Sequence, residues 1–354
     1  MFFSKHMKIT EASRINSALR ARTIEDLLKY PKMGRAMRLF GDAYISEEDP
    51  TVIFPIEEGV IRAFIPSEPT EDNIAQIIRE FYERNPFPNY EEMENVGSLI
   101  EKSVSRGFPE MLNRAIPPNA TVLEVGCGTG QLASFLSIAN RRVLGVDLCL
   151  NSLRLAQRFK TDNDLLNVTF AQMNLFRLPL QPGKFDVVIC TGVLHHTSDP
   201  LRGFRTLLPF VKPGGHVILG LYNRYGRTKT RIRRAMVKVF GEPIVSVDPY
   251  IRNYVVTSPK KHAWFMDQYC NPHESLHTMD EVLDWFDGNG IHFVRALPST
   301  VFGSRFSLEY RRSLFDDESR GSYVDRLLSQ LEQVLSDTEG GLFIMIGRKK
   351  SESA

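Results

Sequence analysis

Apolar positions between residues 118 and 222 form short runs separated by segments with helical spacing. Between the first two runs, Leu132, Phe135, Leu136 and Ala139 recur at the three- and four-residue intervals of a helix face. This alternation predicts βαβ units with a largely parallel sheet. The runs are VLEV (122–125), RVLGVD (142–147), NVTFAQ (167–172), DVVIC (186–190) and HVILGL (216–221).

Further elements are predicted on both sides of this region. Residues 52–66 hold two apolar runs around a Glu-Glu-Gly turn, which indicates a hairpin. Residues 72–84 place Ile74, Ile77, Ile78 and Phe81 on one helical face. Towards the C-terminus we expect a helix at 278–290, strands at 291–298 and 341–350, and between these strands a helix with Tyr323, Leu327, Leu331 and Val334 at apolar spacing.

These patterns divide the chain into a core and its appendages. We expect an N-terminal appendage (1–70), a helical lid segment (71–117), a core (118–222), an insertion over the substrate (223–277), and the remainder of the core (278–354) with a helical insertion at about 300–339.

The stretch VLEVGCGTGQ (122–131) has a glycine-rich turn after a strand, as phosphate-binding loops do. Two phosphate-binding interpretations fit poorly. A P-loop requires Gly-Lys-Ser/Thr, and the dinucleotide fingerprint requires a third glycine where Gln131 stands. Glu124, at the strand end, would repel a pyrophosphate and attract an ammonium group. The ligand that fits is a nucleoside carrying an amino acid, S-adenosylmethionine (SAM).

The second strand ends on Asp147, about 20 residues beyond the loop, where such units hold a ribose diol. We therefore expect Asp147 to bind the ribose of SAM.

Together, VLEVGCGTG, VLGVD, FDVVICTGVLHH and VKPGGHVILGLYN resemble the class I SAM-dependent methyltransferases over residues 118–222. The resemblance implies a doubly wound, Rossmann-like α/β fold with seven mostly parallel strands, the last one antiparallel. It also implies a cofactor site at the strand ends. The expected cofactor-binding residues are Glu124, Gly126, Cys127, Gly128, Gly130, Asp147, Leu148, Asn174, Leu175, Thr191 and Tyr82.

One residue departs from the family pattern. Asn174 stands where an Asp commonly faces the adenine amino group, and its amide oxygen can still accept that hydrogen bond. Tyr82 and Tyr90, ahead of the core, are either lid residues or aromatic packing at a domain seam. NPFPNY (85–90) has only a chance likeness to the Asn-Pro-Pro-Tyr motif of amino-methylating enzymes.

The composition limits which partners, cysteine chemistry and cellular location we expect. The net charge of +2 favours no class of partner for the chain as a whole. Cysteines 127, 149, 190 and 270 contain no Cys-x-x-Cys pair, so we interpret them as reduced packing residues. No run approaches the ~20 apolar residues of a membrane span, and the first ten residues are too polar for a signal peptide. We therefore expect a cytoplasmic location and no integral membrane association.

The 223–277 insertion contains a series of basic residues at helical intervals, with Ile232, Met236, Val239 and Phe240 on another face. Three interpretations stay open: a solvated face, a patch for RNA phosphates, or a surface for anionic lipid or an acidic substrate. The basic residues are Arg224, Arg227, Arg231, Arg234 and Lys238.

Methyl transfer is an in-line displacement that depends mainly on alignment, and a general base matters only where the acceptor atom must lose a proton. The candidates for catalytic or acceptor contacts are His195, His273 and Tyr269, with His196 as a neighbour of His195. A metal site from His273, Glu274 and His277 lacks established ligand spacing, and we expect none.

The leading hypothesis is a SAM-dependent methyltransferase acting on an O, N or activated C atom of a small or lipid-like acceptor, either anionic or amphipathic. One alternative is a tRNA methyltransferase that uses the basic helix. The other is a non-catalytic SAM-binding partner subunit.

Overall fold

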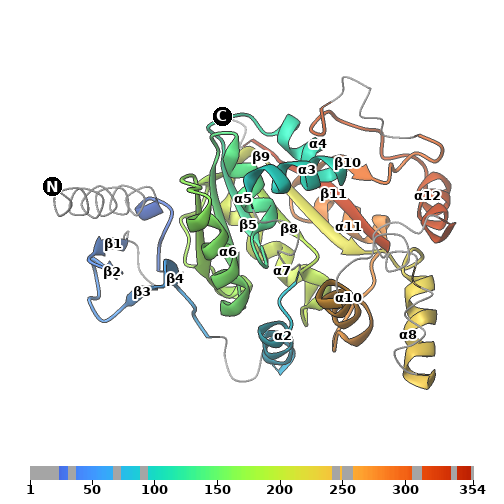
Figure 1. Cartoon of the computed structure of the whole chain (residues 1–354). Coiled ribbons are helices and arrows are strands. Elements are labelled where there is room, and N and C mark those ends of the chain that lie inside the picture. Colours follow the sequence, from blue (N-terminus) through green and yellow to red (C-terminus); the bar gives the residue numbers. More distant parts are fainter. Residues whose placement is uncertain are drawn as a thin grey trace.

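A computed structural model describes residues 24–30, 37–66, 73–87, 95–240, 248, 258–304, 313–335 and 341–351. In these residues a mixed sheet of eleven strands runs through the molecule in the order β1-β2-β3-β4-β7-β6-β5-β8-β9-β11-β10 (Figure 1). The strands are β1 (Met37–Phe40), β2 (Ala43–Ser46), β3 (Ile53–Glu57), β4 (Val60–Arg62), β5 (Thr121–Val125), β6 (Arg142–Asp147), β7 (Val168–Gln172), β8 (Phe185–Thr191), β9 (Val211–Tyr222), β10 (Ile291–Leu297) and β11 (Leu342–Lys349).

The α/β class and the mixed, mostly parallel centre agree with the sequence expectation, but the predicted count of seven strands does not describe the whole sheet. Strands β7, β6, β5, β8 and β9 are parallel, and β11 is antiparallel between β9 and β10. Four more strands, β1 to β4, come from the N-terminal appendage. They join the sheet because β4 pairs in parallel with β7. This appendage is therefore part of the central sheet.

The hairpin predicted at 52–66 is present as β3 and β4, with Ile56 opposite Ile61 and Glu57 opposite Val60. Its two-residue turn consists of Glu58 and Gly59, which both have positive φ (51° and 81°). Positive φ at both turn positions matches the right-handed twist of the two strands, so the turn fixes their register.

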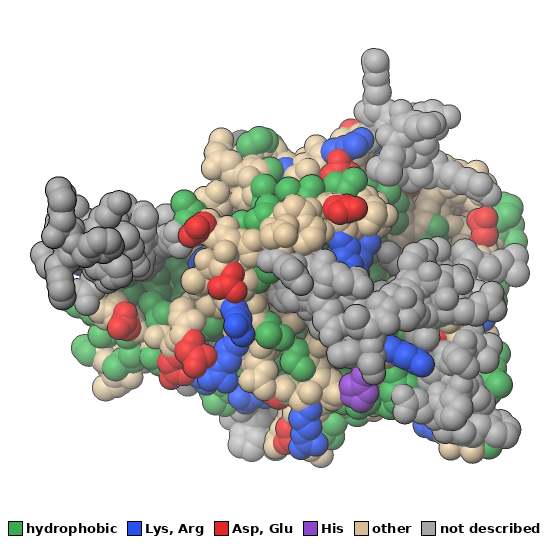
Figure 2. All heavy atoms as spheres, in the orientation of Figure 1, with side chains coloured by type: hydrophobic (Ala, Val, Ile, Leu, Met, Phe, Trp, Pro, Cys, Tyr) green, Lys and Arg blue, Asp and Glu red, His purple; other side chains and the backbone are tan. Residues whose placement is uncertain are grey.

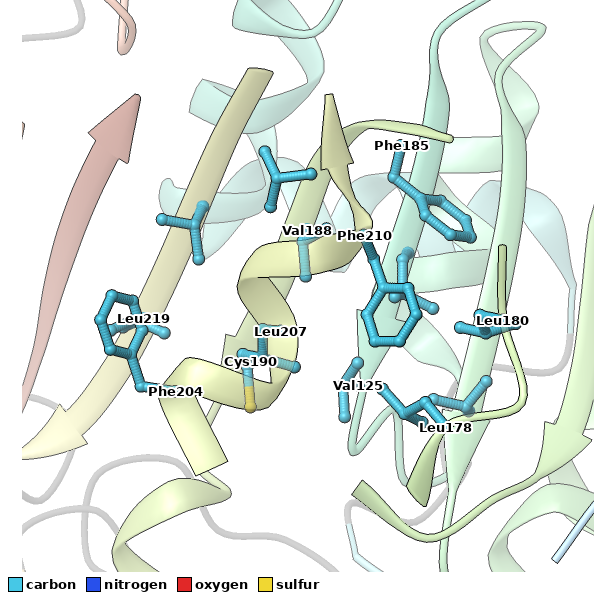
Figure 3. Packing of buried hydrophobic residues seen from close by; sticks show 14 of the residues in the cluster. Val125, Leu178, Leu180, Phe185, Val188, Cys190, Phe204, Leu207, Phe210 and Leu219 are labelled. Atoms are coloured by element: carbon cyan, nitrogen blue, oxygen red, sulfur yellow. The ribbon is translucent and has the colours of Figure 1, made fainter. Parts of the chain in front are cut away.

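Helices cover both faces of the sheet. One face carries α3 (Val96–Ser105), α4 (Phe108–Ala115), α5 (Gln131–Ile138) and α6 (Leu150–Asp162). The other carries α7 (Pro200–Leu207) and α11 (Met279–Asp287), and Figure 3 shows Phe204 and Leu207 of α7 among Val188, Cys190 and Leu219 of the strands. The remaining helices are α2 (Asn73–Arg84), α8 (Thr228–Phe240), α10 (Ser258–Phe265) and α12 (Tyr323–Leu335), with short helical turns η1 (Leu175–Arg177), η2 (Leu194–His196), η3 (Leu208–Phe210) and the π-helical η5 (Met266–Cys270).

Helix α12 forms where its spacing predicts a helix, but two of the four apolar residues at this spacing are exposed. Tyr323 and Leu331 are exposed, whereas Gln330 is buried. The Gln330 side-chain oxygen accepts hydrogen bonds from the Asn223 amide at 2.8 Å and from the backbone of Met279 at 2.9 Å. Polar contacts of Gln330 therefore help to dock this helix, together with the partly buried Leu327 and Val334.

No helix in the described part of the chain is long and apolar enough to cross a membrane. On the face drawn in Figure 2, acidic and basic side chains are interspersed among the described residues. Electrostatic arguments must therefore be local.

Candidate functional site

The strand ends of the parallel centre gather the residues expected to bind a cofactor. Glu124 of β5 is aligned with Gly145 of β6 and Ile189 of β8, and Asp147 ends β6 opposite Gln172 of β7. Because these strands are parallel, their carboxyl ends meet at one edge, where ligands bind in open α/β sheets.

The loop after β5 is shaped by glycines at positive φ: 74° at Gly126, 52° at Gly128 and 73° at Gly130. A β-carbon on Gly126 would lie 2.1 Å from Val193, and one on Gly130 would lie 2.5 Å from the Phe170 ring. Backbone conformation and contacts within the protein thus explain the absence of side chains at Gly126 and Gly130, without reference to a ligand.

Glu124 is buried at the base of this loop. The backbone N–H of Ala133 in α5 donates to its carboxyl group, whereas Oε2 is buried without a hydrogen-bond partner. Burial raises the pKa of Glu124 to about 8; the Ala133 N–H opposes this shift, and Asp147 adds to it. A buried acceptor without a partner costs about 1–3 kcal/mol, so the position favours a ligand that donates a hydrogen bond.

Asp147 is partly buried and holds the loop to the start of α6. Its Oδ2 accepts the N–H of Gly128 at 2.7 Å, and its Oδ1 accepts the N–H of Cys149 at 2.8 Å. Burial raises the pKa of Asp147, and these N–H groups oppose the shift. A carboxylate offers about four lone-pair sites, so Asp147 can accept a ligand hydroxyl in addition to these N–H groups and that of Leu148.

Asn174 is buried after β7, where it caps η1. Its side-chain oxygen accepts the N–H of Phe176 at 3.0 Å, and its amide donates to the carbonyl of Ile65 at 3.5 Å. The other expected cofactor residues lie at the same edge: Cys127 is buried in the loop, and Leu148, Leu175 and Thr191 are partly exposed at or beyond the ends of β6, β7 and β8.

Helix α2 connects this edge to the insertion after β9. The Tyr82 hydroxyl donates to Asp267 Oδ1 at 2.7 Å and accepts from the Asn271 amide at 2.9 Å. Next to it, the Glu83 carboxylate accepts the N–H groups of Leu150 and Asn151, at 2.8 and 3.0 Å, and so caps α6. Sequence reasoning missed Glu83, which carries no motif. Tyr90, the other lid candidate, lies outside the described residues.

His195, in η2 beyond β8, is fully buried. Its ring centroid lies 3.9 Å from that of Tyr222 and 4.2 Å from that of His196, and neither of its ring nitrogens has a hydrogen-bond partner. Burial lowers its pKa well below the ordinary value, and His196 and Arg227 act in the same direction. The His195 ring is therefore neutral and has an unused acceptor nitrogen.

The predicted basic series does not form one exposed surface, because Arg227 lies inside the protein. It is fully buried, and its guanidinium lies 3.7 Å from the centre of the Tyr222 ring. It binds Glu274 through two hydrogen bonds of 3.1 and 2.7 Å, and Arg234 contacts the same carboxylate at 3.4 Å. The sequence did not reveal these pairs, because Glu274 follows Arg227 by 47 residues. Of the predicted series, Arg224, Arg231 and Lys238 are exposed.

The other two catalytic candidates have structural contacts. His273 Nε2 contacts the carbonyl of Thr197 at 3.1 Å, and the His273 carbonyl contacts Nδ1 of His196 at 2.7 Å. The Tyr269 hydroxyl donates to Asp248, and its ring packs with Val237 and Trp264. His273 thus lies beside the histidine pair, whereas the contacts of Tyr269 lie elsewhere in the insertion.

The side chains considered for a metal have separate partners. Glu274 binds Arg227, and His277 Nδ1 contacts Glu281 at 2.8 Å. Within the described ranges, no three His, Cys, Asp or Glu side chains are arranged to hold a metal ion.

Comparisons with known proteins identify the central segment. Residues 123–219 match the family model described as "Methyltransferase domain". An uncharacterized protein of Synechococcus is 27% identical over 222 residues, covering 54% of this chain and 53% of that protein. The ubiquinone biosynthesis O-methyltransferase of Albidiferax ferrireducens is 37% identical over 117 residues (32% and 46%), and that of Serratia proteamaculans is 30% identical over 169 residues (48% and 60%).

The chain spans about half the length of these first relatives. Among solved structures, PKMT2 from Rickettsia typhi in complex with AdoHcy superposes with a TM-score of 0.47 at 17% identity, covering 68% of this chain and 52% of that one.

Proposed function

We propose that this chain, whose residues 123–219 form a class I methyltransferase domain, binds SAM and transfers its methyl group to a small or lipid-like acceptor. The observation that best supports the proposal is the Glu124 carboxyl group, buried beside the glycine loop with Oε2 lacking a partner. An ammonium group would donate the hydrogen bond that this oxygen lacks, and its positive charge would pair with the carboxylate.

The remaining residues of this edge fit the rest of SAM. Asp147 would accept the ribose hydroxyls through its free lone pairs, and Asn174 would face the adenine amino group. Leu148, Leu175 and Tyr82 would enclose the adenosine. Bound SAM supplies a methyl group on a sulfonium, which an acceptor attacks in line; the protein contributes alignment and exclusion of water.

We place the acceptor beside His195, beyond the end of β8. This neutral imidazole can accept a proton from a hydroxyl or amine, and its stacking against Tyr222 fixes its plane. Relatives named ubiquinone biosynthesis O-methyltransferases support an oxygen atom on a lipid-like acceptor. A tRNA acceptor is less favoured, because Arg227 is buried, Arg234 is only partly exposed, and both bind Glu274.

Calorimetry with SAM tests the cofactor site. We expect Glu124→Gln and Asp147→Asn each to weaken SAM binding by about 10- to 150-fold, the loss expected for a hydrogen bond to a charged group. The control is Glu101→Gln, at an exposed carboxylate of α3. Wild-type affinity in both site variants would reject the assignment.

His195→Gln tests the acceptor side. If His195 is the general base, kcat falls about 10²- to 10⁴-fold, while the Kd for SAM measured by calorimetry stays unchanged. Wild-type kcat in this variant would exclude His195 as the base. SAM binding with no methyl transfer to any hydroxyl, amine or activated-carbon acceptor would favour the non-catalytic alternative.

A further inference from the structure

Helix α8 presents its apolar residues to solvent. Ile232, Met236 and Val239 are 56%, 40% and 73% exposed, and their spacing puts them on one face of the helix. On the opposite side Thr230 is buried. This orientation reverses the usual amphipathic arrangement, and an apolar stripe that faces outward indicates a contact surface.

The charged residues of α8 itself all have one sign. Helix α8 has the sequence TKTRIRRAMVKVF, which contains no acidic residue. Arg231 and Lys238 are exposed and lie seven positions apart, so they form a row along one flank of the stripe. Arg224, just before the helix, is exposed as well. The surface is thus apolar along its centre and cationic at its edge.

The side of α8 opposite the exposed stripe is bound to residues around the candidate site. Arg234 contacts the Glu274 carboxylate and donates to the carbonyl of Asn271, and Val237 packs against Tyr269. One residue before the helix, Arg227 binds the same Glu274 and covers the ring of Tyr222. Figure 1 shows α8 at the margin of the molecule.

We infer that α8 docks the protein on an anionic lipid membrane. Ile232, Met236 and Val239 would enter the boundary between headgroups and acyl chains, while Arg231 and Lys238 would meet lipid phosphates. An RNA backbone would match the cations but leave the apolar centre without a partner. An acidic protein surface would likewise pair with the cations but would not account for the exposed Ile232, Met236 and Val239.

The inference also extends the proposed function, on which this part rests. Docking through α8 would hold the region around Tyr222 and His195 close to the bilayer. An amphipathic acceptor could then reach the site without fully exposing its apolar part to water, which is unfavourable.

Vesicle co-sedimentation of the full chain tests the docking. We expect binding to vesicles of phosphatidylcholine with phosphatidylglycerol, and much weaker binding to phosphatidylcholine alone. Replacing Ile232, Met236 and Val239 by Gln should lower partitioning by at least about tenfold. Arg231→Gln with Lys238→Gln should lower it about 30-fold, about fivefold for each charge, and high salt should reduce wild-type binding.

The matched control replaces Val324, Leu328 and Leu331 by Gln. These residues are exposed apolar positions of α12, a helix with Asp325 and Glu332 and without a basic row. The control should bind vesicles like the wild type. Equal losses in the α8 and α12 variants would overturn the inference, as would a wild type that binds neither vesicle.

Light scattering and calorimetry distinguish membrane docking from self-association through α8 and from a loss of SAM binding. A wild-type dimer that the α8 apolar variant converts to a monomer, in a protein that does not bind vesicles, would assign the surface to a second copy and overturn the inference. All variants should bind SAM like the wild type. SAM binding without vesicle binding would reject the docking alone, and vesicle binding without SAM binding would reject the proposed function alone.

Discussion

At the scale of the residue, Glu124 combines a cost in stability with the role in binding that we propose for it. A carboxyl group gains a raised pKa when it is buried, and such a group destabilises the fold once it must ionise. Glu124 lies at the base of the glycine loop, where one of its carboxyl oxygens is buried without a hydrogen-bond partner. A ligand ammonium group would turn the unfavourable charge into an ion pair.

A pH dependence follows from this arrangement. In the ligand-free fold the pKa of Glu124 is raised to about 8 from the ordinary value of 4.5. Between these values the folded chain retains a proton that the unfolded chain loses, so the contribution of Glu124 to the free energy of unfolding falls as the pH rises through this window. We expect Glu124→Gln to stabilise the ligand-free protein at the upper end of the window by on the order of 1–3 kcal/mol, and not below its lower end.

Urea unfolding of the wild type and Glu124→Gln at several pH values measures this effect, with Glu101→Gln as the exposed control. Parallel pH profiles for the wild type and Glu124→Gln would show that Glu124 is not the buried, protonated group described above. Calorimetry in buffers of different ionisation enthalpy adds a second readout, since ionisation of Glu124 on SAM binding would release about one proton.

At the scale of the element, α2 is attached mainly through polar contacts of its last turn. It has no fully buried residue, and Ile77 is 44% exposed. The hydrogen bonds of Tyr82 to Asp267 and Asn271, and those of Glu83 to the start of α6, therefore carry much of its attachment. A helix attached in this way can open at low cost.

Tyr82→Phe tests this attachment, because it removes both hydroxyl contacts and keeps the ring beside His196. We expect SAM to dissociate about 5- to 30-fold faster in stopped-flow experiments, and the amides of residues 73–84 to exchange faster with deuterium. Tyr30→Phe, in the N-terminal region, is the control. Unchanged dissociation with faster exchange would show that α2 does not retain the ligand.

Elements differed in how far the sequence predicted them. The strands β5 to β9 were predicted because burial on both faces makes them continuous apolar runs. Strands β1 and β2 were not, because four residues with mixed exposure leave no clear period. For α8 and α12 the helical spacing was right, but the sequence did not show which side chains would be buried, since long-range polar contacts at Glu274 and Gln330 help to decide how these helices dock.

At the scale of the whole molecule, the order of motifs along the chain predicted the parallel centre, at one edge of which we propose the cofactor site. Sequence order could not predict that the N-terminal strands would lengthen the sheet, because the β4–β7 ladder joins residues about 110 positions apart. Nor could it predict the buried polar group around Tyr222 and Arg227, which depends on a partner in the insertion.

The pairing of β4 with β7 also constrains the order in which the nascent chain can assemble. Residues 37–62 leave the ribosome early, yet the strand that they join ends only at Gln172. Until then the first four strands can form no more than a small meander with an unpaired edge, a species prone to mispairing with other chains. While residues 63–172 are being synthesised, the register of this meander therefore depends on its own turns, such as the one formed by Glu58 and Gly59.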